Sequence, residues 1–522
     1  MEEELVLVID FGGQYCHLIG RRIRDLGVYS EILSYDVTLE ALKPFSQWLK
    51  GVVLSGGPSS VYEENAPNLS ATLLDYLKNN NIPILGLCYG HQLLAQYVGG
   101  DVISKNLKEY GITECNIDIN SILFQGLAKK ETVWMSHGDQ VQNLPQGFST
   151  IASTETCPIA GFSSEKEKIY GLQFHPEVQH TKSGNNILSN FLFKICKCSG
   201  SWVMDNWIDE TLKSIKEKIG KDHVILGLSG GVDSSVVATL LQKAIGDQVH
   251  PIFVNNGVLR KNEPEQVVSL FQDKLEFKNF HYIDASERFL KKLKGIIDPE
   301  EKRKIIAHTF IQIFEEKAAD LKDKYNDIKW LGQGTIFPDR VETQATSKSS
   351  AKIKSHHNVA LPSDMQLKLI EPLRDLYKDE VRQIGLKMGL PEYIVNRQPF
   401  PGPGLAVRCV GEIKEEYLKM LREADYIVRD EIEKTGVHKN LWQYFAIFLP
   451  IQNVGVMGDF RTYEYICAIR AVQSKDAMTA NFAKLDWTLL ERISTRIINE
   501  VKGFNRVVYD ISNKPPSTIE FE

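Results

Sequence analysis

The sequence lacks several features that would direct it to particular classes of protein. Its eight cysteines contain no Cys-x-x-Cys motif, and the only close pair, Cys196 and Cys198, is too sparse for a zinc ribbon. No apolar stretch approaches the roughly 18 residues of a membrane helix, and the acidic start, residues 1–4, is unlike a signal peptide. The net charge of −6 provides no global basic field for nucleic acid. These absences predict a reduced, soluble, cytoplasmic protein that binds neither nucleic acid nor membranes.

What the sequence does contain is the composition of ordinary globular domains. Hydrophobic residues make up 43% and charged residues 25% of the 522 positions, enough to bury sizeable cores. At about 150 residues per domain, this length predicts about three domains. The change of pattern near 200 and the Pro/Gly-rich segment at 396–404, which cannot continue a helix, give expected domains at 1–200, 201–395 and 396–522.

Two regions of the sequence alternate short apolar runs with helix-like patterns. Such alternation predicts parallel α/β sheets with helices on both faces, so we expect a multidomain α/β protein whose second domain is doubly wound. Short strands within 133–138 and 169–174 add an antiparallel portion to the first domain, and the third domain is expected to be α+β. The other expected strands lie within 5–10, 51–57, 82–88, 223–229, 249–257, 280–286, 328–334 and 506–512, and the expected helices within 14–26, 69–78, 233–245, 299–317 and 415–434.

The stretch GLCYG at 86–90 is the thiol version of a nucleophile elbow. Glycines at both flanks, Gly86 and Gly90, permit a sharp turn and a close approach of strand and helix. The residues that follow are helical in pattern, so Cys88 would lie at a helix N-terminus, where backbone N–H groups favour a thiolate. The alternative is a buried, inert cysteine.

A candidate partner for this thiol lies in QFHPEV at 173–178. Pro176 disfavours helical geometry at His175, so the segment is expected to be extended, with His175 and Glu177 on one face. An imidazole oriented by a carboxylate is a suitable base, whereas an ordinary histidine in a surface loop is the alternative. Together with the elbow, the pattern favours a Cys88–His175–Glu177 triad. The Gly-rich turn SGGPSS at 55–60 could supply oxyanion donors or only make the turn.

A second Gly-rich loop, LSGGVDSS at 228–235, follows an apolar run and precedes a helix. Successive N–H groups there would form a nest for phosphate, and the Ser229, Ser234 and Ser235 hydroxyls can donate to phosphate oxygens. The lysine of a Walker loop is missing. Asp233 would repel phosphate unless a cation intervenes, and Mg²⁺ is the natural candidate. The alternative is a strand–helix turn with a capping serine.

These motifs resemble known families. The first set resembles the class I glutamine amidotransferases, and the second loop resembles the SGGxDS loop of the PP-loop ATP pyrophosphatases. Their combination resembles the glutamine-hydrolysing GMP synthetases over essentially the whole chain, through SHGDQV, QFHPEV, LGLSGGVDSS, GQGTIFPD, IKSHHNV, PFPGPGLAVR and KPPSTIEFE. The resemblance implies that ammonia from glutamine aminates XMP at C2 through an adenyl-XMP intermediate, which gives GMP, AMP, pyrophosphate and glutamate. It also implies ATP as co-substrate, Mg²⁺ as cofactor and a homodimer formed through the C-terminal domain.

The resemblance also assigns individual roles. Gly57 and Tyr89 would donate oxyanion N–H groups, and Gln92, Ser136, His137, Gly138 and Asp139 would contact glutamine. ATP would be bound by Ser229, Gly230, Gly231, Val232, Asp233, Ser234, Ser235, Val254 and Gly334, with Asp233 as the metal ligand. Asp339, Glu342 and Lys354 would belong to a lid that completes the adenylation site. XMP would contact Arg303, Pro401, Gly402, Gln443, Arg506, Lys514, Thr518, Ile519 and Glu520.

The sequence departs from the expected pattern at one position and leaves other interpretations open. Asn255 stands where the family is expected to carry Asp, which removes a charge near the nucleotide. The C-terminal tail could be frayed, although Pro515 and Pro516 stiffen it and favour a docked tail. Another PP-loop amidotransferase that makes NAD or asparagine is an alternative, against which the tail and PFPGPG argue. A nucleotide-binding scaffold with decayed catalysis is a second, against which the intact triad and phosphate loop argue.

Overall fold

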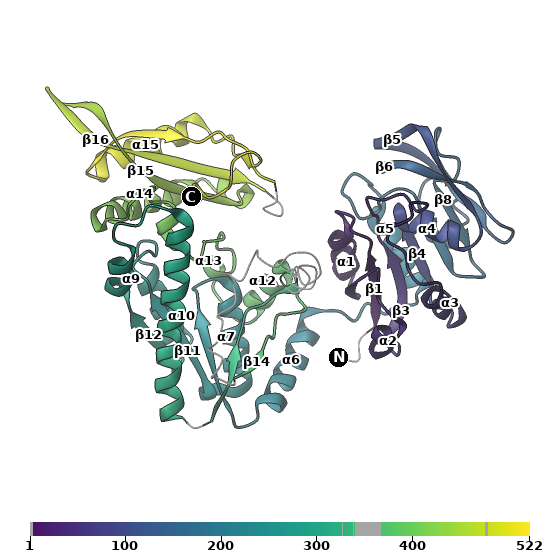
Figure 1. The fold of residues 1–522 in the computed structure, drawn as a ribbon, viewed down its shortest axis with the longest axis horizontal. Helices are drawn as coiled ribbons and strands as arrows, with labels where there is room; N and C mark the ends of the chain where they lie inside the picture. The colour runs from purple at the N-terminus through teal and green to yellow at the C-terminus, as the bar shows by residue number, and fades with distance from the viewer. Residues whose placement is uncertain (1–3, 326, 338, 340–366, 475–478) are drawn as a thin grey trace. The chain divides into compact units, whose positions relative to one another are not determined.

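The structure is a computed structural model that describes residues 4–325, 327–337, 339, 367–474 and 479–522 (Figure 1). The chain divides into two compact units, Met1–Glu210 and Thr211–Glu522. Two expected lid residues, Glu342 and Lys354, lie outside the described residues. The expected boundary at 395 falls within the second unit and stays a prediction. No helix among the described residues is both long and apolar enough to span a membrane.

The first unit is built on a nine-stranded sheet in the order β2-β1-β3-β4-β9-β8-β7-β5-β6. Strands β2, β1, β3, β4 and β9 are parallel to one another, and the remaining strands pair antiparallel. The predicted parallel sheet with an attached antiparallel portion is therefore confirmed. The strands are β1 (Leu5–Asp10), β2 (Tyr29–Ser34), β3 (Leu49–Leu54), β4 (Ile84–Leu87), β5 (Asp101–Ile117), β6 (Lys130–Asn143), β7 (Ser149–Ser153), β8 (Gly161–Ser164) and β9 (Ile169–Leu172).

Helices cover both faces of the parallel strands. Every residue from Leu5 to Ile9 in β1 is at most 2% exposed, although successive side chains point to opposite faces, so neither face of this strand is open to solvent. Helix α3 begins where the Ser70 hydroxyl accepts a hydrogen bond from the Leu73 amide at 3.3 Å, the usual N-cap interaction. The helices of this unit are α1 (Cys16–Asp25), α2 (Leu39–Leu42), α3 (Ala71–Asn79), α4 (Tyr89–Tyr97) and α5 (Gly184–Ser189), and α6 (Met204–Ile219) follows them.

The second unit contains a five-stranded, all-parallel sheet in the order β12-β11-β10-β13-β14. Gly332 of β13 pairs with Leu226 of β10, and a Cβ at Gly332 would lie 3.2 Å from Leu241 of α7. The residue after Leu226 in β10 is Gly227, and a Cβ there would lie 3.5 Å from the ring of Phe314 in α10. Since neighbouring residues of a strand point to opposite faces, α7 and α10 cover opposite faces, and the doubly wound prediction is confirmed. The strands are β10 (His223–Leu228), β11 (Val249–Asn255), β12 (His281–Asp284), β13 (Ile328–Gly332) and β14 (Lys368–Ile370).

The C-terminal part of the second unit is α+β, as expected. Strands β15 and β16 form a long antiparallel hairpin, and β18 adds parallel to β16. One hydrophobic core runs from Ile225 in β10 to Phe448 in β15 and Phe504 in β18, which joins this part to the parallel sheet. The strands are β15 (Gln443–Met457), β16 (Phe460–Gln473), β17 (Asn481–Phe482) and β18 (Phe504–Tyr509). The helices of the unit are α7 (Val232–Ile245), α8 (Glu263–Val268), α9 (Ser286–Leu293), α10 (Pro299–Lys324), α12 (Lys378–Lys387), α13 (Glu392–Val395), α14 (Glu415–Lys434) and α15 (Trp487–Glu500).

Candidate active sites

Cys88 lies at the sharp turn between β4 and α4. Its φ of +51° is a left-handed conformation that is costly for a non-glycine residue, and its amide donates to the Leu172 carbonyl at 2.8 Å. A Cβ at Gly86 would lie 2.3 Å from the Gly90 carbonyl oxygen, and one at Gly90 would lie 2.4 Å from that of Leu54. Both glycines are therefore required by backbone contact, and the turn has the elbow geometry that the sequence predicts.

The structure brings His175 and Glu177 to this thiol. His175 Nδ1 lies 2.7 Å from Glu177 Oε1, and both side chains are buried. Burial lowers the pKa of His175, but the Glu177 carboxylate and the adjacent Cys88 thiol outweigh burial and hold this pKa well above its ordinary value. Thr181 fixes the segment, since its hydroxyl donates to the His175 carbonyl at 2.6 Å. A thiol and an imidazole oriented by a carboxylate are the parts needed for nucleophilic attack on an amide.

The Gly-rich turn after β3 packs directly against the elbow. A Cβ at Gly56 would lie 3.3 Å from His175 Cε1 and 3.7 Å from Cys88 Cβ. A Cβ at Gly57 would lie 3.2 Å from the ring of Tyr89. Gly57 is thus adjacent to the Tyr89 side chain, and the role of the Gly57 and Tyr89 amides as an oxyanion hole stays a prediction.

Polar groups of three further segments surround the thiol. Gln92 Nε2 donates to the Asp139 carbonyl at 2.8 Å and to Gln173 Oε1 at 3.1 Å. Gln173 Nε2 in turn lies 3.7 Å from Cys88 Sγ, and this thiol lies 3.6 Å from the Ser136 carbonyl. Sequence analysis missed Gln173, although its spacing of two residues before His175 is the period that places side chains on one face of an extended segment.

His137 uses both of its ring nitrogens within the protein. Nδ1 lies 2.9 Å from the Asp139 carbonyl and Nε2 lies 3.3 Å from Glu109 Oε2. Burial raises the pKa of Glu109, but the contact with His137 Nε2 and the hydrogen bond from Thr154 outweigh burial and lower this pKa, which keeps the group a carboxylate. The expected role of His137 as a glutamine contact stays a prediction.

The two other residues of the SHGD motif lie beside it. The Asp139 carboxylate accepts hydrogen bonds from the Ser60 hydroxyl and from Tyr62, the latter at 2.9 Å. A Cβ at Gly138 would lie 3.6 Å from the aliphatic stem of Lys108. These contacts join the 136–139 segment to the Gly-rich turn after β3.

The phosphate loop of the second unit is held by its own serines. Gly230 adopts φ +73°, which turns the chain into α7 with Gly231 at the N-cap. The Gly231 amide donates to Ser229 Oγ at 3.2 Å, and Ser229 Oγ lies 3.1 Å from Ser234 Oγ. Ser235 Oγ donates to the Gly231 carbonyl at 2.8 Å. A loop of this geometry at a helix N-terminus is suited to bind phosphate.

A lysine from a distant helix reaches this loop. Asp233, in the first turn of α7, accepts contacts from Lys378 Nζ at 2.8 and 2.6 Å. Gly334 packs against the same turn, since its Cβ position lies 3.2 Å from Asp233 Cβ. Lys378 begins α12, 145 residues after Asp233, and sequence analysis missed it because no local motif marks it. The loop that lacks a Walker lysine therefore has a lysine beside it from elsewhere in the fold.

Arg397 is a second cation that sequence analysis missed at this loop. Its Nη1 donates to the Gly230 carbonyl at 2.9 Å, and its Nη2 pairs with Glu263. The expected ATP contact Val254 is 3% exposed with its side chain in the hydrophobic core, so only its backbone can face a nucleotide. Val232, the first residue of α7, is also buried.

Asn255, the departure from the expected pattern, has a local explanation. Its Nδ2 lies 3.2 Å from the Tyr282 hydroxyl and 3.4 Å from Asp284 Oδ1. Its Oδ1 accepts from the Gly257 amide at 3.0 Å. An amide can donate to Asp284, whereas a carboxylate at this position would face it with like charge.

The C-terminal tail is docked in the structure. Arg408 is fully buried and donates to both carboxylate oxygens of Glu520 at 2.9 and 2.8 Å, a bidentate pair. Gln443 Nε2 donates to Glu520 Oε1 at 3.1 Å, and Arg303 Nη2 donates to the Glu522 carbonyl at 2.5 Å. These expected XMP contacts, distant in sequence, are thus brought together at the tail.

Other expected XMP contacts line the same region. Arg470 donates to the carbonyls of Thr518 at 2.8 Å and Ile519 at 3.2 Å. The Lys514 amide donates to the Ala480 carbonyl at 2.7 Å. Thr518 and Glu520 line a hollow together with residues of β15, β16 and β18. The tail backbone is therefore fixed along most of its length.

Four further candidates come from β18, the PFPGPG segment and the expected lid. Arg506 is exposed on β18, and a Cβ at Gly402 would have open space around it. Pro401 accepts from the Gly404 amide at 2.8 Å, which closes the turn within PFPGPG. Asp339, the described lid candidate, accepts from the Ile336 amide at 3.2 Å.

Comparisons with known proteins agree with this architecture. Family models match at residues 7–195 (glutamine amidotransferase class-I), 204–304 (NAD synthase) and 430–521 (GMP synthase C terminal domain). The GMP synthase (glutamine-hydrolyzing) of Brachyspira hyodysenteriae is 53% identical over 518 residues, which cover 99% of each chain. That of Caldicellulosiruptor saccharolyticus is 52% identical over 524 residues, with full coverage of both chains.

These matches decide against a different PP-loop amidotransferase that makes NAD or asparagine. The NAD synthase model covers only residues 204–304, whereas the C-terminal model is that of GMP synthases. The two relatives are GMP synthases along the whole chain, amidotransferase part included. The chain therefore belongs to the family of glutamine-hydrolysing GMP synthases.

Proposed function

We infer that this protein is an enzyme that makes GMP from XMP, ATP and glutamine, with AMP, pyrophosphate and glutamate as the other products. The observation that carries this function is the presence of two chemically complete sites in one chain: a thiol–imidazole–carboxylate set in the first unit and a phosphate loop with an adjacent lysine in the second. We further propose domains at 1–200, 201–395 and 396–522, and a location in the cytoplasm.

In the first site, Cys88 attacks the side-chain amide of glutamine. His175 takes the thiol proton and passes it to the leaving nitrogen, so that ammonia departs and a thioester remains for water to hydrolyse to glutamate. The raised pKa of His175 supports this role, because Glu177 stabilises the charged imidazolium that forms. The Gly57 and Tyr89 amides would stabilise the oxyanion, a contribution of about 3–4 kcal/mol per donor in comparable sites. Gln92, Ser136, His137, Gly138 and Asp139 would orient glutamine.

In the second site, the XMP O2 attacks the α-phosphate of ATP and pyrophosphate leaves. The loop 229–235 would hold the β- and γ-phosphates through its N–H groups and serine hydroxyls, with Val254 and Gly334 beside the nucleotide. Lys378 pairs with Asp233 in this structure. When ATP is bound, the ammonium group of this lysine would pair with those phosphates instead. Ammonia then displaces AMP at C2. Asp339, Glu342 and Lys354 would close over this site.

The residues present fit a Mg²⁺ ion beside the phosphate loop. Asp233 offers hard carboxylate oxygens and its side chain is 29% exposed, so a phosphate-bound cation can reach it. When bound, Mg²⁺ would neutralise charge on the phosphates. Asp233 would be its protein ligand.

XMP would lie against the docked tail. Arg506 and Lys514 carry charges suited to its 5′-phosphate. Because Arg408 and Gln443 fix the Glu520 carboxylate, this group has one orientation in which to accept from the nucleoside. The complete proposed set is Arg303, Pro401, Gly402, Gln443, Arg506, Lys514, Thr518, Ile519 and Glu520.

The reaction can be tested directly with purified protein. We expect GMP and AMP to form in equal amounts from XMP, ATP and glutamine, because one adenylate is displaced per amination. Chromatographic quantification of both nucleotides over time checks this result, with reactions that omit XMP as the control. Formation of ADP instead of AMP, or AMP without GMP, would contradict the proposal.

We also propose that the protein is a homodimer formed through an arm at the end of the β15–β16 hairpin, residues 450–464 (Figure 1). By register, Val454, Val456 and Tyr463 share one face of this ribbon with Arg461, and the three apolar residues are 51%, 74% and 61% exposed. Three exposed apolar side chains on one face of a projecting two-stranded ribbon favour burial against another surface. The same face on a second copy would cover it through a two-fold axis, the commonest oligomer symmetry.

Introducing charge into this arm tests the dimer. We expect Val456→Asp to convert dimer to monomer in analytical ultracentrifugation, because it places carboxylates in an apolar contact. Ile297→Asp is the matched control, since Ile297 is 64% exposed but lies outside the arm. A monomeric wild-type protein, or a dimer unaffected by Val456→Asp, would rule out this interface.

A further inference from the structure

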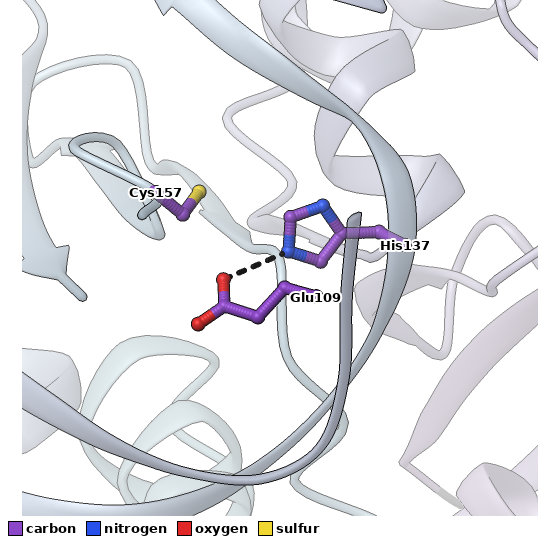
Figure 2. A group of neighbouring side chains, drawn as sticks. All are labelled: Glu109, His137 and Cys157. Atoms are coloured by element: carbon purple, nitrogen blue, oxygen red, sulfur yellow. Dashed lines mark hydrogen bonds and ion pairs between the residues drawn. The ribbon is translucent and has the colours of Figure 1, made fainter. Parts of the chain in front are cut away.

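A cluster of three chemically different side chains lies in the antiparallel part of the first unit. Glu109 comes from β5, His137 from β6 and Cys157 from the segment between β7 and β8. One oxygen, one nitrogen and the sulfur of these residues lie within 4.8 Å of one another, on three sides of one small space (Figure 2). The Glu109 and His137 side chains are only 12% and 5% exposed, and Cys157 is fully buried.

The contacts of His137 indicate which ring nitrogen carries the proton and which one faces this space. A backbone carbonyl can only accept, so the contact of Nδ1 with the Asp139 carbonyl at 2.9 Å requires the proton on Nδ1. In the neutral ring, Nε2 then presents a lone pair to Glu109 Oε2 at 3.3 Å. Two acceptors that face each other in a buried site require a proton or a cation between them. A ring N–H held by a carbonyl, with the other nitrogen facing such donors, is the usual arrangement of a metal-binding histidine.

The distances and the donor set point to one ion. Zinc–nitrogen and zinc–oxygen bonds of about 2.0–2.2 Å in a tetrahedron separate the two ligand atoms by about 3.3–3.5 Å. The observed separation of Nε2 and Oε2 is 3.3 Å, and Cys157 Sγ, which lies within 4.8 Å of both atoms, would move closer to them when the metal binds. A thiolate, an imidazole and a carboxylate together suit zinc rather than magnesium or calcium. We propose that Glu109, His137 and Cys157 form a Zn²⁺-binding site.

The surrounding contacts support the three ligands and join them to the glutaminase site. Thr154 Oγ1 donates to Glu109 Oε2 at 3.2 Å and accepts from the Cys157 amide at 2.9 Å, so one side chain orients two ligands. The carbonyl that holds His137 also accepts from Gln92. Zinc would therefore fix the segment 136–139 next to Cys88. Binding replaces the Cys157 thiol proton by the metal and releases that proton, so affinity rises with pH.

Metal titration of the full-length protein tests this site. After chelator treatment and dialysis, Zn²⁺ and Co²⁺ affinities are measured by competition with a chromophoric chelator, and the Co²⁺ form is examined for a thiolate-to-metal charge-transfer band. We expect one tight equivalent per chain. Cys157→Ser and Glu109→Gln should each weaken that equivalent by at least about 10-fold, and Cys157→Ser should remove the charge-transfer band. Cys198→Ser, which removes another buried thiol of the same unit, should leave both unchanged.

Two results would overturn the site. One is a wild-type protein that retains no tight equivalent. The other is equal affinity and an unchanged cobalt spectrum in Cys157→Ser, which would assign the metal to other ligands, such as the mutually adjacent His223, His250 and His281 of the second unit. Glu109→Gln preserves the shape of the side chain, and circular dichroism of each variant separates ligand loss from unfolding.

Discussion

Replacing Cys88 with alanine is expected to abolish GMP formation from glutamine, with a loss of at least about 1,000-fold, and to leave formation from ammonium salts intact. The thiol is the nucleophile in the proposed mechanism, and removal of a nucleophile costs enzymes of this kind at least that factor. Ammonia supplied from solution bypasses the first site, because the second site needs only the released product. Initial rates of GMP formation with each nitrogen source measure the two outcomes.

The structure offers a matched control for this experiment. Cys198 is another buried thiol of the first unit, and its charged neighbours are Glu4 and Lys50, so Cys198→Ala should keep both activities. Loss of ammonia-dependent synthesis in Cys88→Ala would show that the two sites do not act separately. Retention of glutamine-dependent synthesis would show that Cys88 is not the nucleophile.

The local motifs of the first site could be predicted from sequence because the residues of each motif determine its own backbone conformation. GLCYG contains the glycines that the contacts of Gly86 and Gly90 require, and the extended HPE segment places His175 and Glu177 on one face. The strands β1 and β10 were equally predictable, since buried parallel strands are nearly continuous apolar runs. What these motifs could not give is the environment of His137, whose ring contacts Glu109 from another strand.

The cations of the second site show why part of a site escapes sequence analysis. Lys378 and Arg397 lie 145 and 167 residues after their partners in the phosphate loop. Lys378 belongs to no motif, and Arg397 lies in the Pro/Gly-rich segment 396–404, which indicated a domain boundary but no role for this arginine. Their positions depend on how α12 and the segment after α13 pack against α7. A single lysine on a helix usually faces solvent, so the sequence alone does not indicate that Lys378 contacts the phosphate loop. The phosphate loop has no Walker lysine in its own sequence, and tertiary structure places Lys378 beside it instead.

Removing this lysine is expected to slow the adenylation half of the reaction. Lys378→Met and Asp233→Asn should each lower ammonia-dependent GMP formation by about 100-fold or more, the usual effect of losing one preorganised charge at a developing anion. Glutamine hydrolysis measured without XMP should change much less, because that site lies in the other unit. Rates of AMP release and of glutamate release, measured separately, distinguish the two effects.

The direct contact between the two side chains gives this prediction a sharper form. Lys378 and Asp233 lie 2.6 Å apart, so their effects should not add, and the double variant should be about as slow as the slower single variant. Lys387→Met removes a lysine from the other end of α12 and should leave the rate unchanged. A normal ammonia-dependent rate in Lys378→Met would exclude a role in holding pyrophosphate. Fully additive losses would mean that the two residues act at separate steps. The ion pair between them would then have no part in binding phosphate.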